Sequence, residues 1–378
     1  MLPSALSLLL ACAHTLPPTM VPTDTLPYTT ADGWHSEIRH YAGTGAPVLL
    51  VHGMGANHYN WDYRPEVSLA AYLQARGYDV WIPELRGDPG AFAPSKHARA
   101  YTFDDHAIYD LPAVVDAVRT ATGAPKLLWV GHSMGGMLLY TTLEQEPDAI
   151  AAGVVLGSPA VLPDETGSHK FIARYGWIVG HRGVLPVAGP TRLSVRLFAR
   201  YNLMYGRLGV RSNLDWPVAN GIAEHGLIDM SRPMAHQAVE WLRAGVVTKE
   251  DGTRWITGGA AVPMLAFGGS RDHVVPAEDV EASCALYPDC HYVLLGKATG
   301  FSVEYGHVDT VVGKTSAAEV YPMIEGFLSN YVDATRPAAV PVPESPAPTA
   351  LPDDAIAFPA DAPTPQAQPP AEDGAESR

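Results

Sequence analysis

Gly131-His132-Ser133-Met134-Gly135 is the stretch that decides the fold of this chain. An apolar run, Leu127–Val130, precedes it, and a second one, Met137–Tyr140, follows it. The spacing G-x-S-x-G between an apolar strand and a helix is typical of a sharp turn that lifts a serine Oγ clear of a sheet. Glycine at both ends lets neighbouring backbone approach the turn, and the first amides of the helix favour negative charge beside the serine. The pattern therefore predicts that Ser133 is a nucleophile.

Two further side chains follow in the order that such a serine requires. Asp272 lies in the loop after a predicted buried strand at 262–269, and His307 lies in a loop after the next predicted strand, at 291–295. His307 would take the proton of Ser133 and later pass it to the leaving group, while Asp272 would fix the imidazole tautomer. Taken singly, Asp272 could be a helix cap and His307 an ordinary loop histidine. Their order and their positions at strand ends favour a catalytic triad.

A candidate oxyanion hole lies in the loop after the apolar strand 47–51. This loop reads His52-Gly53-Met54-Gly55. In the elbow arrangement one backbone N–H comes from the residue after the nucleophile, here Met134, and a second comes from the loop after an early strand. We assign the second N–H to Met54. The alternative is a glycine-rich turn without a chemical role.

On these residues the sequence resembles the α/β-hydrolase superfamily from about residue 29 to about residue 332, and within it the lipase and esterase branch that includes the acid lipases. The closer resemblance lies in the segments 68–87, 102–116 and 306–309. It implies ester hydrolysis through an acyl-enzyme, without a metal or an organic cofactor. The loop reads HGMG rather than the bulkier acid-lipase version, and the elbow reads GHSMG, which is widespread among small esterases.

The alternation of apolar strands and helices predicts an α/β fold with a doubly wound, mostly parallel sheet, which opens with a hairpin around 31–34. An inserted, mainly helical cap is expected at about 159–259, as such insertions cover the active site in this superfamily. Arg192, Arg196 and Arg200 have helical spacing beside an apolar face, and they either meet anionic groups or form a solvated face. Several large apolar side chains either line an acyl pocket or form the core of the cap: Trp177, Trp216, Trp241, Trp255, Met204, Met230 and Met234.

Composition limits the partners. The chain has 378 residues and a net charge of −15, without a run of Lys or Arg, so nucleic-acid binding is not expected. No stretch reaches the roughly 20 apolar residues of a membrane-spanning helix. We expect a small-molecule or lipid ester as substrate, and the sequence leaves the oligomeric state open.

Both ends of the chain differ from the body. Residues 1–11 are apolar and short, and Cys12 follows them, which resembles a bacterial lipoprotein signal with Cys12 as the lipidated residue, although no Lys or Arg precedes the apolar run. This predicts attachment in the cell envelope, and the alternative is an apolar terminus on a cytoplasmic chain. Residues 13–28, rich in Pro and Thr, are expected to form a tether. Residues 335–378, rich in Pro, Ala and acidic residues, are expected to be disordered or to recruit a partner as a polyproline segment.

The resulting division of the chain is a signal and tether at 1–28, the hydrolase core at 29–158 and 260–334, the cap at 159–259 and the tail at 335–378. Cys284 and Cys290 either close a small loop as a disulfide or stay free thiols, depending on the compartment. Three functions remain: a serine carboxylester hydrolase, an acyltransferase with the same acyl-enzyme, and a non-catalytic binding protein on this scaffold. Serine rather than aspartate at the elbow argues against dehalogenase and epoxide hydrolase chemistry.

Overall fold

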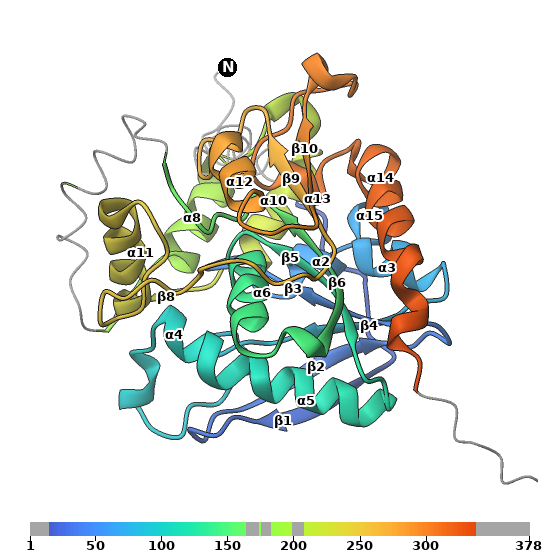
Figure 1. The fold of residues 1–378 in the computed structure, drawn as a ribbon. Coiled ribbons are helices and arrows are strands. Elements are labelled where there is room, and N and C mark those ends of the chain that lie inside the picture. The colour runs from blue at the N-terminus through green and yellow to red at the C-terminus, as the bar shows by residue number, and fades with distance from the viewer. Residues whose placement is uncertain (1–14, 164–173, 175–182, 199–207, 338–378) are drawn as a thin grey trace, which may run out of the picture. The chain divides into compact units, whose positions relative to one another are not determined.

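The computed structural model describes residues 15–163, 174, 183–198 and 208–337 (Figure 1). Cys12, three cap residues of the sequence analysis (Trp177, Arg200 and Met204) and the tail from residue 338 onward lie outside this part. Its centre is an eight-stranded sheet with the strand order β1-β2-β4-β3-β5-β6-β9-β10, and two further strands, β7 and β8, pair with each other. The strands are β1 (Asp24–Thr29), β2 (His35–Tyr41), β3 (Pro47–Val51), β4 (Asp79–Pro83), β5 (Leu127–His132), β6 (Ile150–Leu156), β7 (Val184–Leu185), β8 (Met230–Ser231), β9 (Met264–Gly269) and β10 (Cys290–Leu295).

The sheet is mostly parallel, as predicted. Only β1 with β2 and β2 with β4 pair in the antiparallel sense, and β4, β3, β5, β6, β9 and β10 run parallel. The antiparallel edge comes from the hairpin expected around Ala31–Trp34, which joins β1 to β2. Every residue of β3 and β5 is buried, as expected for central strands covered on both faces.

Helices cover the two faces of the sheet separately. In β3, Leu49 and Val51 belong to one hydrophobic core, and Val48 and Leu50 belong to the other, because successive side chains of a strand point to opposite faces. Helices α5, α6 and α12 pack into the first core, and α3 and α15 pack into the second (Figure 1). The α-helices are α2 (Tyr59–Asp62), α3 (Leu69–Gln74), α4 (Phe103–Asp105), α5 (Leu111–Thr122), α6 (Met134–Gln145), α8 (Ala188–Phe198), α10 (Trp216–His225), α11 (Arg232–Ala244), α12 (Ala277–Cys284), α13 (Asp309–Val312), α14 (Ser316–Glu319) and α15 (Tyr321–Leu328).

The chain between β6 and β9 contributes α8, α10 and α11. A buried carboxylate on α4 fastens this segment to the core. Asp104 Oδ1 accepts hydrogen bonds from Gln237 Nε2 of α11, at 2.7 Å, and from Trp255 Nε1, at 2.6 Å, and its Oδ2 accepts one from the backbone N–H of Glu250, at 2.8 Å. Three donors on one carboxylate offset the cost of burying it.

The prediction that residues 13–28 form a tether is wrong in part. Residues Asp24–Thr29 form β1, and the residues before it are held to the core: Tyr63 Oη donates to the Leu16 carbonyl at 2.5 Å, and the Thr19 N–H donates to the Tyr63 carbonyl at 2.9 Å. Proline is tolerated here because β1 is an edge strand. Similarly, Thr335, which we assigned to the tail, is buried and closes a 3₁₀-helix that spans Ser329–Thr335.

Cys284 and Cys290 form a disulfide. The bond joins the last residue of α12 to the first residue of β10, with a Cα–Cα distance of 5.5 Å. Of the two alternatives left open by the sequence, the structure contains the closed loop. Within the described ranges, no helix has the length and apolar character needed to cross a membrane.

The turn between β5 and α6 is the tightest part of the fold. A Cβ atom on Gly135 would lie 2.0 Å from the Val51 carbonyl oxygen at the end of β3, and one on Gly131 would lie 2.3 Å from the Gly135 carbonyl oxygen. Backbone cannot yield to such contacts as a flexible side chain can. Glycine is therefore required at both positions, as the elbow pattern predicts.

We expect Gly135→Ala to lower the free energy of unfolding by about 3 kcal/mol, the upper part of the range for overpacked interiors, because α6 must move away from β3. Urea unfolding of the purified protein measures this. Gly326→Ala is the matched control, since Gly326 lies on the exposed side of α15 and an added Cβ would meet nothing within 4 Å. The control should be neutral or gain up to about 1 kcal/mol. Equal urea midpoints for Gly135→Ala and the wild type would contradict the packing described here.

Candidate active site

Ser133 occupies the turn between β5 and α6 in an unusual backbone conformation. Its φ is 53° and its ψ is −119°, and among the described residues it is the only non-glycine with positive φ. The Ser133 N–H donates to the Leu156 carbonyl of β6 at 2.9 Å, and its own carbonyl accepts from the N–H of Gly136 at 3.0 Å. A strained conformation of this kind persists only where its surroundings fix it, and such sites are often functional.

Asp272 and His307 form a hydrogen-bonded pair. His307 Nδ1 lies 2.7 Å from Asp272 Oδ2, and both side chains are buried. The other carboxylate oxygen, Oδ1, accepts the backbone N–H groups of Val274 at 2.8 Å and Val275 at 2.9 Å. Because Nδ1 is engaged by the carboxylate, Nε2 is the ring nitrogen available to a group in front of His307. The fixed carboxylate holds the ring in one orientation.

His132, directly before Ser133, supports the loop of His307. Its Nε2 lies 3.1 Å from the His307 carbonyl oxygen, and its Nδ1 lies 3.1 Å from Asn60 Oδ1. Burial, and then the neighbouring His307 and His52, hold the pKa of His132 well below its usual value, so the ring is neutral. A neutral ring donates from one nitrogen only, and Asn60 Nδ2 is buried without a partner. If the amide oxygen and nitrogen of Asn60 are exchanged, the amide N–H donates to His132 Nδ1 and no longer lacks a partner. His132 Nε2–H then donates to the His307 carbonyl.

Asp309 holds the same loop from the other side. Its Oδ1 accepts the N–H of Gly306 at 2.9 Å and of Val210 at 3.1 Å, and its Oδ2 accepts from Asn213 Nδ2 at 3.0 Å. The hydrogen bond from Gly306 ties Asp309 to the loop of His307. Burial raises the pKa of Asp309 to about 6, although these three donors oppose the shift. The carboxylate therefore joins the His307 loop to the chain before α10.

The loop after β3 passes directly over Ser133. A Cβ on Gly53 would lie 3.1 Å from Ser133 Cβ, so the loop and the turn are in van der Waals contact. Met54, from this loop, and Met134, from the first turn of α6, line one cavity together with Ser133 and His307. The two residues expected to supply oxyanion donors thus lie beside the serine.

This cavity has a volume of about 430 Å³, within the usual range of ligand pockets. The chain between β6 and β9 supplies a large part of its wall. Apart from His132 and His307, none of its described lining residues is ionisable; the apolar side chains are Met54, Ala56, Met134, Met137, Pro159, Leu162, Leu208, Ile222, Leu227, Met230, Ala238, Trp241, Leu242, Val274, Val275 and Val308. Met230 and Trp241 thus line the cavity, and Trp241 also belongs to the core in which Met234 and Trp255 are buried.

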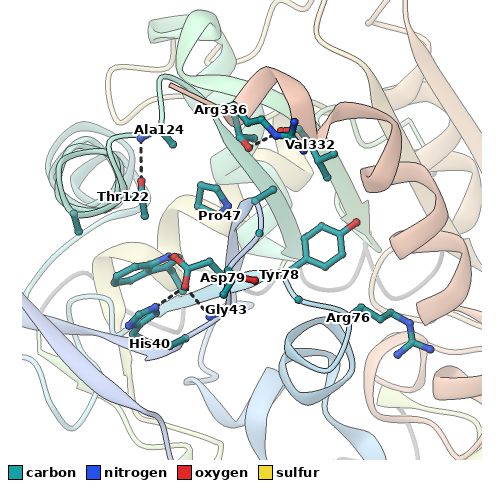
Figure 2. A pocket seen from close by; sticks show the side chains of 18 of the residues that line it. His40, Gly43, Pro47, Arg76, Tyr78, Asp79, Thr122, Ala124, Val332 and Arg336 are labelled. Carbon is teal, nitrogen blue, oxygen red and sulfur yellow. Dashed lines mark hydrogen bonds and ion pairs between the residues drawn. The ribbon is translucent and has the colours of Figure 1, made fainter. Parts of the chain in front are cut away.

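A larger cavity, of about 770 Å³, lies at the opposite, amino-terminal ends of β3 and β4. Figure 2 shows His40 and Asp79 turned toward each other in it. Asp79 accepts from His40 Nε2 at 2.7 Å, from the Gly43 N–H at 3.0 Å and from Trp81 Nε1 at 2.8 Å. These polar groups satisfy one another, and ligands in open α/β sheets bind at the carboxyl ends of the strands. The smaller cavity is therefore the candidate active site.

Two supporting residues were not predicted from the sequence. Gly157, after β6, has a φ of 57°, and a Cβ there would lie 3.1 Å from His307 Nδ1 and 3.2 Å from Asp272 Oδ2. Its only signal in the sequence was a glycine at the end of the apolar run 152–156. The side chain of His52 had no assigned role either. His273, beside Asp272, is exposed. Across the described ranges, no cluster of three or more His, Cys, Asp or Glu side chains is arranged to hold a metal ion.

Comparison with known proteins agrees with the fold. The family model of the α/β-hydrolase fold matches residues 46–307. Human gastric triacylglycerol lipase is 33% identical over 142 residues, which cover 33% of this chain and 36% of the lipase. Lipase 1 of Drosophila melanogaster is 34% identical over 155 residues, which cover 38% of this chain and 35% of that protein. The chain thus spans just over a third of the length of these relatives.

Solved structures share the fold at low sequence identity. A thermophilic esterase from Thermogutta terrifontis has a TM-score of 0.56 at 21% identity, and the match covers 82% of this chain and all of the esterase. A membrane phospholipase A, described as a bacterial virulence factor, has a TM-score of 0.55 at 19% identity, over 82% of this chain and 86% of the phospholipase. Since the family model spans most of the sheet and both flanks of the elbow, the chain belongs to the α/β-hydrolase fold family, and the relatives it resembles in sequence are lipases.

Proposed function

We propose that the protein is a serine carboxylester hydrolase that acts through an acyl-enzyme on esters with an apolar acyl group. One observation carries the proposal: Ser133 and the Asp272-bound His307 line the same apolar cavity. The sequence similarity to lipases supports an ester as the substrate.

In the first half of the reaction Ser133 Oγ attacks the ester carbonyl, and His307 Nε2 takes the Oγ proton. Asp272 keeps the ring oriented and stabilises the imidazolium that forms. The N–H groups of Met54 and Met134 stabilise the oxyanion of the tetrahedral intermediate. The intermediate collapses when the bond to the alcohol oxygen breaks, and His307 returns the proton to the leaving alcohol.

In the second half, water replaces the alcohol. His307 Nε2 removes a proton from the water as its oxygen attacks the acyl carbon, and the same two N–H groups stabilise the second oxyanion. Collapse breaks the bond to Ser133 Oγ, which recovers its proton from His307. The products are a carboxylic acid and an alcohol.

The lining of the cavity supports an uncharged acyl group. No Lys, Arg, Asp or Glu is among its described lining residues, so an ionised acyl group would lose its hydration without gaining a partner. An alkyl or aryl acyl chain would instead gain about 25 cal/mol for each Å² of apolar surface that it buries.

We further propose that the protein is exported and attached to the cell envelope through Cys12. The Cys284–Cys290 disulfide supports export, because disulfides persist mainly in oxidising compartments. Stable membrane attachment needs more than one acyl chain, which lipidation of an N-terminal cysteine would provide.

Ser133→Ala should abolish ester hydrolysis, with a loss on the order of 10⁶-fold in kcat, and should leave the fold intact. Steady-state assays with p-nitrophenyl esters of graded chain length measure the loss, and added alcohols test acyl transfer in the same assay. A fluorophosphonate should label the wild type at Ser133. Ser329→Ala, at an exposed serine, serves as the control and should keep full activity and labelling. Labelling at another serine would refute the assignment.

Asp272→Asn and His307→Ala should each impair kcat severely, and the double variant should be hardly worse than the poorer single one. The reason is that triad members act as a unit, so their effects do not add. His273→Ala, at the exposed neighbour of Asp272, should keep near-normal activity. Full activity in Asp272→Asn, or losses that multiply in the double variant, would show that the mechanism is wrong.

Cys12→Ala should move the full-length protein from the membrane fraction to the soluble fraction of a bacterial host, because the site of lipidation is lost. Replacing Cys284 and Cys290 together by serine is the control and should leave the protein in the membrane fraction. An intact, unmodified Met1 found by mass spectrometry on soluble wild-type protein would exclude anchoring through Cys12.

A further inference from the structure

His52 lies at the end of β3, directly before the loop that carries Met54, and both of its ring nitrogens face acceptors. Nδ1 lies 3.0 Å from the Gly53 carbonyl oxygen, and Nε2 lies 3.0 Å from Asp88 Oδ2. A carbonyl and a carboxylate oxygen have no hydrogen to donate, so each ring nitrogen must carry one. His132 differs, since its partner Asn60 can present an amide N–H instead. The geometry therefore makes His52 an imidazolium, although only 2% of the residue is exposed.

The Asp88 carboxylate that faces His52 is itself held by a backbone hydrogen bond. Asp88 Oδ2 also accepts the Leu85 N–H at 2.8 Å, whereas Asp88 Oδ1 and Glu84 Oε2 are buried with no donor in reach. Burial, and then the charge and hydrogen bond of Asp88, raise the pKa of Glu84 to about 10. A neutral Glu84 supplies the hydrogen that these two oxygens lack. The carboxylate of Asp88 is thus the negative group that faces the ring of His52.

The ionisable groups around His52 and its acidic partners come from several elements. Asp88 and Glu84 follow β4, His132 ends β5, and His58, directly before α2, has its Nε2 3.5 Å from Glu84 Oε1. Burial lowers the pKa of His52, but the Asp88 carboxylate and the two hydrogen bonds outweigh it and raise the pKa above its usual value. His132, which is neutral, adds no competing charge.

The carbonyl that His52 contacts belongs to the same peptide group as the Met54 N–H. Gly53 O accepts from His52 Nδ1 and from the Ala56 N–H at 3.2 Å. The peptide bonds of the described residues are all trans, so the Gly53 C=O and the Met54 N–H point in opposite directions. Two donors on the carbonyl side fix the plane of this peptide and polarise its N–H.

We propose that His52, held as an imidazolium by Asp88, is a positioning residue that orients and polarises the Gly53–Met54 peptide as an oxyanion donor. The inference rests on the proposed ester hydrolysis. It predicts an effect on kcat rather than on KM, because His52 does not line the cavity and acts on charge that develops only in the transition state.

His52→Gln tests the proposal, because glutamine cannot supply a charged donor to both partners. Loss of a whole oxyanion donor costs roughly 100- to 1,000-fold in kcat, so loss of its support should cost about 10-fold, with KM unchanged. His40→Gln is the matched control: His40 also lies between two acidic partners, Asp24 and Asp79, but far from the cavity. It should leave kcat unchanged.

Asp88→Asn tests the proposal through the pH dependence of kcat, which would not change if the role of His52 were purely structural. Asp88 raises the pKa of His52, so the imidazolium persists to higher pH in the wild type. Without that carboxylate the proton is lost earlier, and the alkaline limb of the kcat profile should move to lower pH by at least about one unit. The acid limb should stay in place. An unchanged alkaline limb would overturn the proposal.

One measurement needs no variant. In the NMR spectrum of the wild type at pH 8, where exposed histidines are neutral, the ring assigned to His52 through its nuclear Overhauser contacts with Gly53 should carry protons on both nitrogens. A singly protonated ring would overturn the proposal even if neither variant folds. If the wild type does not hydrolyse esters or is not labelled at Ser133, the proposed function fails; if it does both while His52→Gln keeps its kcat, only this inference fails.

Discussion

The backbone of Ser133 is the constraint on which the rest of the site depends. A serine with φ of 53° is stable here only because β3, β5 and β6 meet at the turn: α6 presses through Gly135 against the end of β3, and the Ser133 N–H is bound by β6. The strain is therefore balanced by the packing of the central sheet. It directs the Oγ toward a cavity at the carboxyl ends of the strands, where the loops that carry the other groups converge.

Hydrogen bonds between loops then place those groups. The His307 carbonyl is held by His132 and by Thr310 Oγ1, at 2.8 Å, and the start of its loop is held by Asp309. The loop that carries Met54 is held by His52 and by the Ala56 N–H. Burial and the neighbouring histidines keep His132 neutral, whereas the two acceptors that face its ring nitrogens make His52 charged in our proposal. Two histidines in similar burial thus take different forms.

The sequence predicted the elements whose signals are local. Spacing along the chain is enough to identify the elbow glycines, the apolar strands and the order Ser133, Asp272, His307. The prediction of a mostly parallel sheet followed from these features. It failed where partners lie far apart in the chain. Residues 15–23 read as a tether because their hydrogen bonds come from Tyr63 and Pro217. The pairing of His52 with Asp88 depends on the neighbouring positions of β3 and β4 in the sheet, which no local pattern specifies.

A crystal structure of the protein inhibited by an alkyl phosphonate tests the central claim most directly. The account predicts phosphorus bonded to Ser133 Oγ, the alkyl chain in the apolar cavity, and the phosphonyl oxygen within about 2.7–3.1 Å of the N–H groups of Met54 and Met134. His307 Nε2 should face the oxygens of the adduct. An adduct on another residue, or a phosphonyl oxygen turned away from both N–H groups, would contradict it.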